Sequence, residues 1–136
     1  MSYLGQQGAT GHGEIGFALK NIGSQICSTG GYPGVLFLDK TGAALPTTPT
    51  RTTHDLAGSV PIRQLTVAPG SSVSFRLFVT HFGPSGSSTG CTTAAGLQVI
   101  PPNDTATLRT PIGDGGATEC QTLTVSPLQP GTAAYP

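Results

Sequence analysis

Two stretches of the chain alternate between apolar and polar side chains with a period of two. In residues 14–21 the apolar positions are Ile15, Phe17 and Leu19. In residues 73–80 they are Val73, Phe75, Leu77 and Val79. This alternation is typical of a β-strand that has one face in the core and the other in solvent. We therefore predict two half-buried strands, and Phe78 on the polar face of the second indicates partial cover there.

A third apolar segment, Val35 to Leu38, is apolar on both faces and predicts an interior strand beneath a second layer. Shorter extended segments fall within 60–68, 97–100, 105–108 and 121–126. Turn residues separate them at short intervals, and a helical period is absent from the sequence. Seven or eight short strands of this kind predict an immunoglobulin-like antiparallel β-sandwich.

The predicted domain covers residues 14–128 as a single unit, as expected for a chain of 136 residues. Residues 1–13 are rich in Gly and Gln without periodicity, and we expect a flexible lead-in. Residues 43–59 hold two prolines and many threonines, which favours a long loop or an edge segment. Residues 129–136 are expected to form a C-terminal tail.

Charge is scarce and balanced in this chain. Only 9% of the residues are charged, against about 25% in an average soluble domain. Six basic and six acidic residues are scattered without runs, so nucleic acid is not an expected partner. We expect no transmembrane segment, because no stretch approaches the ~20 apolar residues of a span. The first residues also lack the pattern of a signal peptide, so the protein is either cytoplasmic or an exported protein whose leader has been removed. The low charge, the abundance of Thr and Gly and the many short strands favour export.

The chain has three cysteines, and their spacing does not resemble a zinc site. Cys91 and Cys120 each precede a predicted strand, so a disulfide between them is plausible. Pairing of Cys27 with either of the others stays open at this point. With the first pairing, Cys27 is the odd thiol, either unpaired or available to link two chains.

Two strings match catalytic motifs without the context that the chemistry needs. The G-x-G-x-x-G at residues 11–16 precedes a strand rather than a helix, which argues against a dinucleotide site. The G-x-S-x-G at residues 86–90 lies in a Gly/Ser-rich loop, and no histidine follows it, so the chain order of an α/β-hydrolase triad fails. We expect neither a cofactor nor an enzyme.

Four residues remain as candidates for binding. His54, Asp55 and His81 are the candidates for a metal or small-ligand site, although exposed loop positions explain them more simply. Tyr32, beside Pro33 and several glycines, is a candidate surface contact, against the simpler interpretation of a turn residue capping the core.

Several ordered blocks of the chain resemble an actinobacterial family of exported proteins and lipoproteins, a domain of unknown function numbered 4232. The blocks are Gly11-His12, Asn21-Ile22-Gly23, Cys27, Gly31-Tyr32-Pro33-Gly34-Val35, Leu65 to Ser71, Cys91, Leu97 to Pro102, and Cys120 with Leu123-Thr124-Val125. The resemblance implies an immunoglobulin-like sandwich outside the membrane. It also implies a cysteine before Cys27 as the usual partner of that thiol, and this chain has none.

These observations favour a non-enzymatic module of the cell exterior or cell envelope, with a binding or structural role toward another surface component. A metal- or small-ligand-binding sandwich that uses the loop histidines is the alternative.

Overall fold

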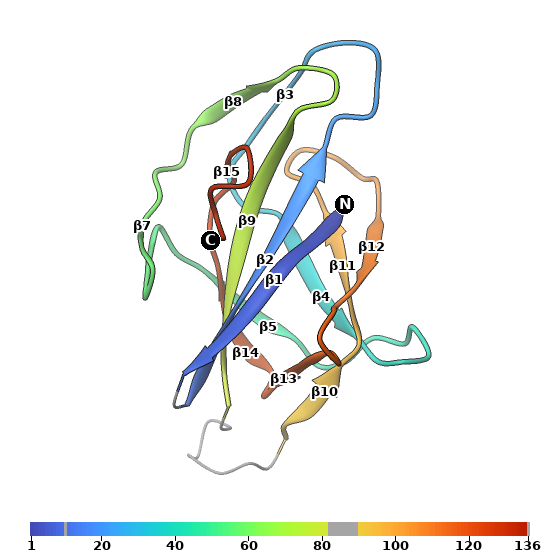
Figure 1. Cartoon of the computed structure of the whole chain (residues 1–136), viewed down its shortest axis with the longest axis vertical. Helices are drawn as coiled ribbons and strands as arrows, with labels where there is room; N and C mark the ends of the chain where they lie inside the picture. Colours follow the sequence, from blue (N-terminus) through green and yellow to red (C-terminus); the bar gives the residue numbers. More distant parts are fainter. Residues whose placement is uncertain (10, 82–89, 136) are drawn as a thin grey trace.

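A computed structural model describes residues 1–9, 11–81 and 90–135 and shows two layers of β-strands (Figure 1). The first layer is a six-stranded sheet in the order β1-β2-β9-β14-β5, with β15 paired to β9. Its strands are β1 (Ser2–Ala9), β2 (His12–Lys20), β5 (Thr48–Arg51), β9 (Ser72–Thr80), β14 (Thr122–Val125) and β15 (Gln129–Pro130). We call this layer the large sheet.

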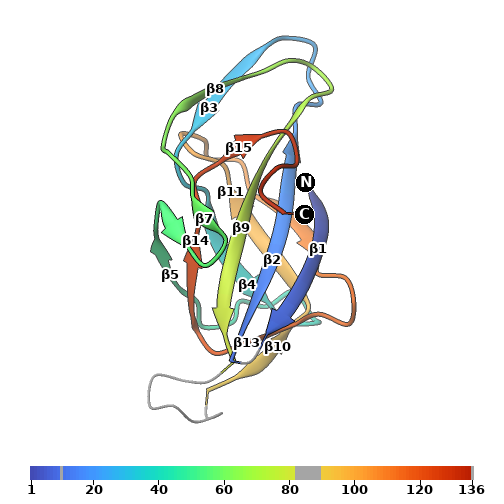
Figure 2. The ribbon, with the colours of Figure 1, turned by 60° about the vertical axis from the view of Figure 1, so that its left-hand side comes forward.

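The second layer is a three-stranded sheet in the order β12-β11-β4. Its strands are β4 (Gly34–Leu38), β11 (Gly96–Ile100) and β12 (Leu108–Pro111). Two short strand pairs, β3 (Cys27–Gly30) with β8 (Gln64–Val67) and β10 (Thr92–Ala94) with β13 (Ala117–Glu119), lie at opposite ends of the molecule (Figures 1 and 2). A small hairpin joins β6 (His54–Asp55) to β7 (Gly58–Ser59).

The centre of the fold is the antiparallel pair β2 and β9. Its register runs without interruption from the pair His12 and Thr80 to the pair Lys20 and Ser72. On the inner face, the rings of Phe17 and Phe75 stack at 5.6 Å between centroids. Phe37 of β4 faces them from the second layer and is likewise fully buried. The apolar alternation therefore forms the core where the sequence predicts it.

The predicted fold class is confirmed, because the described residues form an all-β sandwich without a helix. The strands expected at 14–21, 35–38 and 73–80 are present as β2, β4 and β9. One pairing departs from the antiparallel expectation, since β5 runs parallel to β14 at the edge of the large sheet.

Both expected terminal segments are structured, and those predictions are wrong. Within residues 1–13, β1 pairs with β2 over most of its length. Within 129–136, β15 pairs with β9 and Ala134 is buried. Residues 43–59, expected as a long loop or an edge segment, contain β5 at the edge of the large sheet and the β6–β7 hairpin. Each of these segments either pairs with a strand far away in the sequence or lacks alternating apolar and polar residues. The sequence pattern therefore does not reveal that they form strands.

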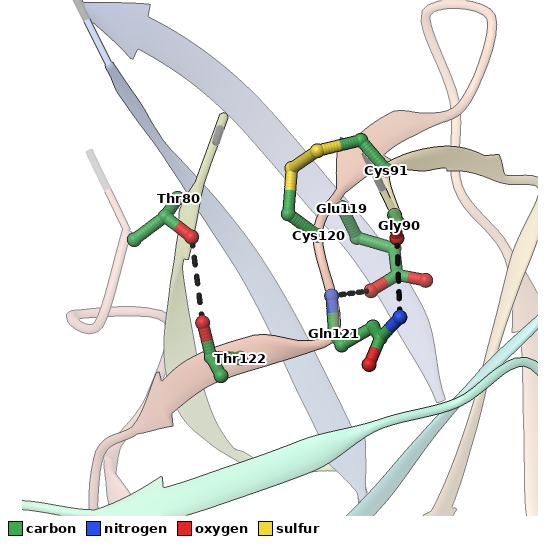
Figure 3. The surroundings of a disulfide bond; sticks show 7 residues. All are labelled: Thr80, Gly90, Cys91, Glu119, Cys120, Gln121 and Thr122. Atoms are coloured by element: carbon green, nitrogen blue, oxygen red, sulfur yellow. Dashed lines mark hydrogen bonds between the residues drawn. A yellow bond between two sulfur atoms is a disulfide. The ribbon is translucent and has the colours of Figure 1, made fainter. Parts of the chain in front are cut away.

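The Cys91–Cys120 disulfide is present, which confirms the first of the predicted pairings (Figure 3). It joins the residue before β10 to the residue after β13, and Cys120 lies two residues before the start of β14. The turn that follows is held by a hydrogen bond from the Gln121 backbone N–H to Glu119 Oε2 at 2.6 Å. Gln121 has a φ of 79°, a left-handed conformation. The G-x-S-x-G string lies outside the described residues apart from Gly90.

Removal of the disulfide by Cys91→Ala with Cys120→Ala is expected to lower the free energy of unfolding. The cysteines are 29 residues apart, and closing a loop of that length restricts the unfolded chain by about 3.6 kcal/mol. Urea denaturation measures the change. The matched control is Cys27→Ser, because Cys27 is an exposed free thiol, and its stability should equal that of the parent. A double variant as stable as that control contradicts the prediction.

The ionised carboxylate of Glu119 is expected to lower the free energy of unfolding at neutral pH. The residue is 1% exposed, and its Oε1 has no hydrogen-bond partner. Burial raises the pKa of this carboxyl, against a smaller opposing effect of the Gln121 N–H. A folded pKa above the unfolded value means that stability is highest at acid pH and falls as pH rises through the folded pKa.

The variant Glu119→Gln removes the ionisation and is expected to be more stable at pH 7, by roughly 1 kcal/mol, the lower end of what an unpaired buried polar atom costs. At pH 3, where the parent carboxyl is protonated, the two proteins should unfold alike. Thermal unfolding at both pH values measures this, and an equal gain at both would count against it.

Candidate functional site

The outer face of the large sheet, which points away from the core, carries a row of polar and aromatic side chains across five strands. The register places Gln7, Glu14, Phe78, Thr124 and Thr50 opposite one another in turn. Cross-strand neighbours on one face of a sheet lie within contact distance. Residues from β1 to β5 therefore form one continuous surface.

One end of this outer face is covered by the C-terminal segment. The Ala134 N–H donates to Ser74 Oγ at 3.0 Å, and the Tyr135 side chain lies directly over Gly16. A Cβ at Gly16 would collide with Tyr135, so the glycine is required for this close approach. This cover explains why Gly16 and Ala18 are buried on a face predicted to be exposed.

The middle of the outer face is covered by the β6–β7 hairpin. Arg76 Nε donates to Asp55 Oδ2 at 2.8 Å, and both side chains are buried. The same guanidinium donates from Nη2 to the Gly58 carbonyl at 3.2 Å. Because a buried charge needs a partner, this ion pair fixes the hairpin on the sheet. The tip residue Leu56 remains 70% exposed.

The remaining part of the outer face is open and forms a cavity of about 470 Å³, which we call the outer groove. Its walls carry the hydroxyl and imidazole groups of Thr50, Thr80, Thr122, Thr124, His12 and His54. Thr80 Oγ1 and Thr122 Oγ1 lie 3.4 Å apart, as Figure 3 shows. Phe78 and Leu56 contribute apolar surface. The groove thus combines hydrogen-bonding groups with one aromatic ring.

A smaller cavity of about 230 Å³ adjoins the outer groove and shares His12, Leu56 and Phe78 with it. Gln7 and Glu14 complete its polar lining, and we call it the Glu14 pocket. Glu14 is 4% exposed. Its Oε1 accepts a hydrogen bond from Gln7 Nε2 at 2.6 Å, while its Oε2 is buried without a partner.

The predicted candidates His54 and Asp55 both line the outer groove, but His81 does not join them. His54 Nδ1 lies 2.8 Å from Ser59 Oγ, and Asp55 is bound to Arg76. His81 is exposed and lies beside Gly13 on β2. Across residues 1–9, 11–81 and 90–135, no three His, Cys, Asp or Glu side chains are close enough to hold a metal ion.

Tyr32 and Cys27 lie away from the groove. Tyr32 is half-buried against the core, with the Arg51 guanidinium 5.5 Å from its ring centroid. The thiol of Cys27 is free and exposed on β3. It borders a separate hollow of about 370 Å³ at that end of the sandwich. Two exposed isoleucines, Ile22 and Ile26, precede it in the chain.

Sequence reasoning missed the main polar residues of the site, which are Gln7, His12 and Glu14. Glu14 lies on the strand face that the alternation predicts to be in solvent. The hairpin lies in the segment predicted as a long loop or an edge segment, and the N-terminal strand lies in the predicted flexible lead-in. The only signal in the sequence was Phe78, an aromatic residue at a polar position of a regular strand.

The family described as "Domain of unknown function (DUF4232)" matches residues 1–129. The chain belongs to this family. The match includes β1, the outer groove and the Glu14 pocket, so the site lies within the family's own domain. Among curated proteins and solved structures there is no significant match. The described residues contain no helix long and apolar enough to cross a membrane.

The Asp55–Arg76 ion pair is expected to hold the hairpin over the sheet. In Asp55→Asn the amide oxygen still accepts the bond from the Ala57 N–H, but the charge facing Arg76 is lost. A buried arginine without its counter-ion costs roughly 3 kcal/mol. We expect faster hydrogen exchange of the Val60 N–H, which donates to the Thr53 carbonyl at 2.7 Å.

The control is Asp104→Asn, the same change at an exposed carboxylate that also accepts backbone N–H bonds. This variant should exchange like the parent protein. Equal exchange in all three proteins would show that the ion pair does not hold the hairpin.

Proposed function

We propose that this protein is a non-enzymatic binding module that acts outside the cytoplasm, secreted or held in the cell envelope, and that the outer groove is its ligand site. The observation that carries the proposal is the groove itself. The chain covers two parts of the outer face with its own segments and leaves open the part that carries hydroxyls, imidazoles and Phe78. Concave surfaces with few, convergent polar groups are the usual form of a ligand site.

A location outside the cytoplasm is supported by the disulfide and by the composition. Structural disulfides form and persist in oxidising compartments and are rare in the cytosol of most organisms. The Cys91–Cys120 bond is part of the core at the base of β14, because Cys120 is fully buried. With only 9% charged residues and abundant Thr and Gly, the composition of the chain is more typical of exported proteins than of cytoplasmic enzymes.

A binding role is favoured over hydrolysis by the arrangement around His54. A histidine beside a serine hydroxyl can activate it as a nucleophile when a third group orients the ring. Here Ser59 provides the hydroxyl, but the neighbouring Asp55 carboxylate binds Arg76. The pair also lies on an exposed two-strand hairpin, so the polar groups of the groove are suited to hydrogen bonding with a bound ligand.

The alternative function, small-ligand binding by the loop histidines, is favoured by one observation. His54 lies in the same groove as His12, a histidine from the large sheet. In this version the ligand is a small molecule rather than a surface polymer, and the site is the same.

The proposal is tested by amide chemical shifts of ¹⁵N-labelled full-length protein mixed with soluble fragments of cell-envelope polysaccharide and peptidoglycan. Shifts are expected to concentrate at Thr50, Thr80, Thr122 and Thr124. Thr124→Arg fills the groove and should weaken binding at least about tenfold, equivalent to about 1.4 kcal/mol.

The matched control is Thr66→Arg, at an exposed threonine on β8 away from the groove, and it should bind normally. Shifts confined to another surface, or turnover of a fragment that Thr124→Arg abolishes, would contradict the proposal. A response to small molecules alone would favour the alternative ligand class.

A further inference from the structure

The Glu14 pocket contains a carboxylate oxygen whose burial the rest of the chain does not explain. Glu14 is 4% exposed, and Oε2 has no hydrogen-bond partner within the described residues. Buried carboxylates are normally paired with a cation or fully hydrogen-bonded, because burying an uncompensated charge is costly. Oε1 meets this requirement through Gln7, and Oε2 does not. The empty space beside the carboxyl is about 230 Å³.

His12 is the one side chain of the pocket besides Glu14 that can carry a charge, and no ion pair joins it to Glu14 within the described residues. Gln7, on the neighbouring strand, is neutral. Arg76 lies one row further along the sheet, and its guanidinium donates to Asp55 and to the Gly58 carbonyl. Tyr135 lies near enough for the charge of Glu14 to contribute to raising the pKa of its phenol, after the larger effect of burial. Within the described residues, the Glu14 carboxyl therefore has no cationic partner.

The walls of the pocket complement an organic cation. Phe78 sits directly across the strand pair from Glu14, so an aromatic face adjoins the carboxylate. Ammonium groups are attracted to aromatic rings and form their strongest hydrogen bonds with carboxylates. Leu56 and Ala57 at the hairpin tip add apolar surface that fits methylene groups. A volume of about 230 Å³ suits a short alkylammonium rather than a larger ring system.

We propose that the Glu14 pocket binds an aliphatic primary ammonium group, with the Glu14 carboxylate as the charge partner, Gln7 as the residue that orients the carboxyl, and Phe78 as the aromatic wall. The inference rests on the proposed function, because the pocket shares His12, Leu56 and Phe78 with the outer groove. It adds the chemical class of the ligand, which is a component with a free amine. The amine lies in the Glu14 pocket, and the adjoining part of the same ligand lies in the outer groove.

The test is a titration of ¹⁵N-labelled full-length protein with n-butylammonium chloride at constant ionic strength. Saturable amide shifts are expected at His12, Glu14, Leu56 and Phe78, with a Kd on the order of millimolar for so small a probe. The neutral analogue 1-butanol should bind at least about tenfold more weakly, since it lacks the charge.

Two variants identify the groups responsible. Glu14→Gln keeps the shape of the side chain and removes its charge, and it should lower the affinity for butylammonium at least about tenfold. Phe78→Leu keeps an apolar side chain and removes the aromatic face, and it should lower the affinity several-fold. Glu119→Gln is the matched control, because Glu119 also has a buried carboxyl oxygen without a partner but does not line the Glu14 pocket. This variant should bind butylammonium like the parent. The dispersion of each spectrum verifies folding.

A pocket that holds only water gives no saturable shift, and that result overturns the inference. Equal affinity for butanol and butylammonium, or undiminished binding by Glu14→Gln, also overturns it. The two proposals are separated by their ligands, because Thr124 lines only the groove and Glu14 lines only the pocket. If fragments bind and butylammonium does not, the amine site is refuted and the groove stands. If butylammonium binds and fragments do not, the amine site stands and envelope fragments are refuted as ligands of the groove.

Discussion

The rest of the structure depends on the pairing of β2 with β9. These two strands run side by side from His12 and Thr80 to Lys20 and Ser72, in the middle of the large sheet. Their inner faces supply Phe17, Phe75 and much of the core. Because side chains alternate along a strand, the same register also fixes every residue on the outer face. The core and the candidate site are therefore two sides of one strand pair.

Burial of both faces of this pair creates the polar contacts that shape the site. Once the hairpin and the C-terminal segment cover the outer face, each polar group beneath them needs a partner. Arg76 obtains one from Asp55, and Ser74 from the Ala134 N–H. These bonds hold the covering segments in place, and the places where the cover ends become the walls of the outer groove and the Glu14 pocket. The site thus results from incomplete cover of a central strand pair.

The core of the fold could be predicted from the sequence, whereas of the candidate site only His54 and Asp55 could, and one physical reason explains the difference. The alternation of apolar and polar residues in 14–21 and 73–80 indicates which side chains form the inner face, because the core needs large apolar side chains. The outer face is covered through glycine, a salt bridge and single hydrogen bonds, which leave no periodic pattern. Gly16 is an example, since its role is visible only when Tyr135 lies over it. The disulfide was predictable from its position before two strands, and Cys27 stayed unpaired as that pairing implied.

Glu14 and Glu119 each have a buried carboxyl oxygen without a hydrogen-bond partner in the described part of the chain. We assign an effect on stability to Glu119 and a role in binding to Glu14. Glu119 accepts the Gln121 N–H in the turn after the disulfide, and burial raises the pKa of its carboxyl. The burial of Glu119 therefore affects stability, because protonation of the carboxyl at acid pH removes the buried charge without a ligand. Glu14 instead lines an open cavity together with Phe78, so space for a charge partner lies beside its carboxyl. This neighbouring cavity, more than burial itself, is the reason why we propose a role in ligand binding for Glu14 and not for Glu119.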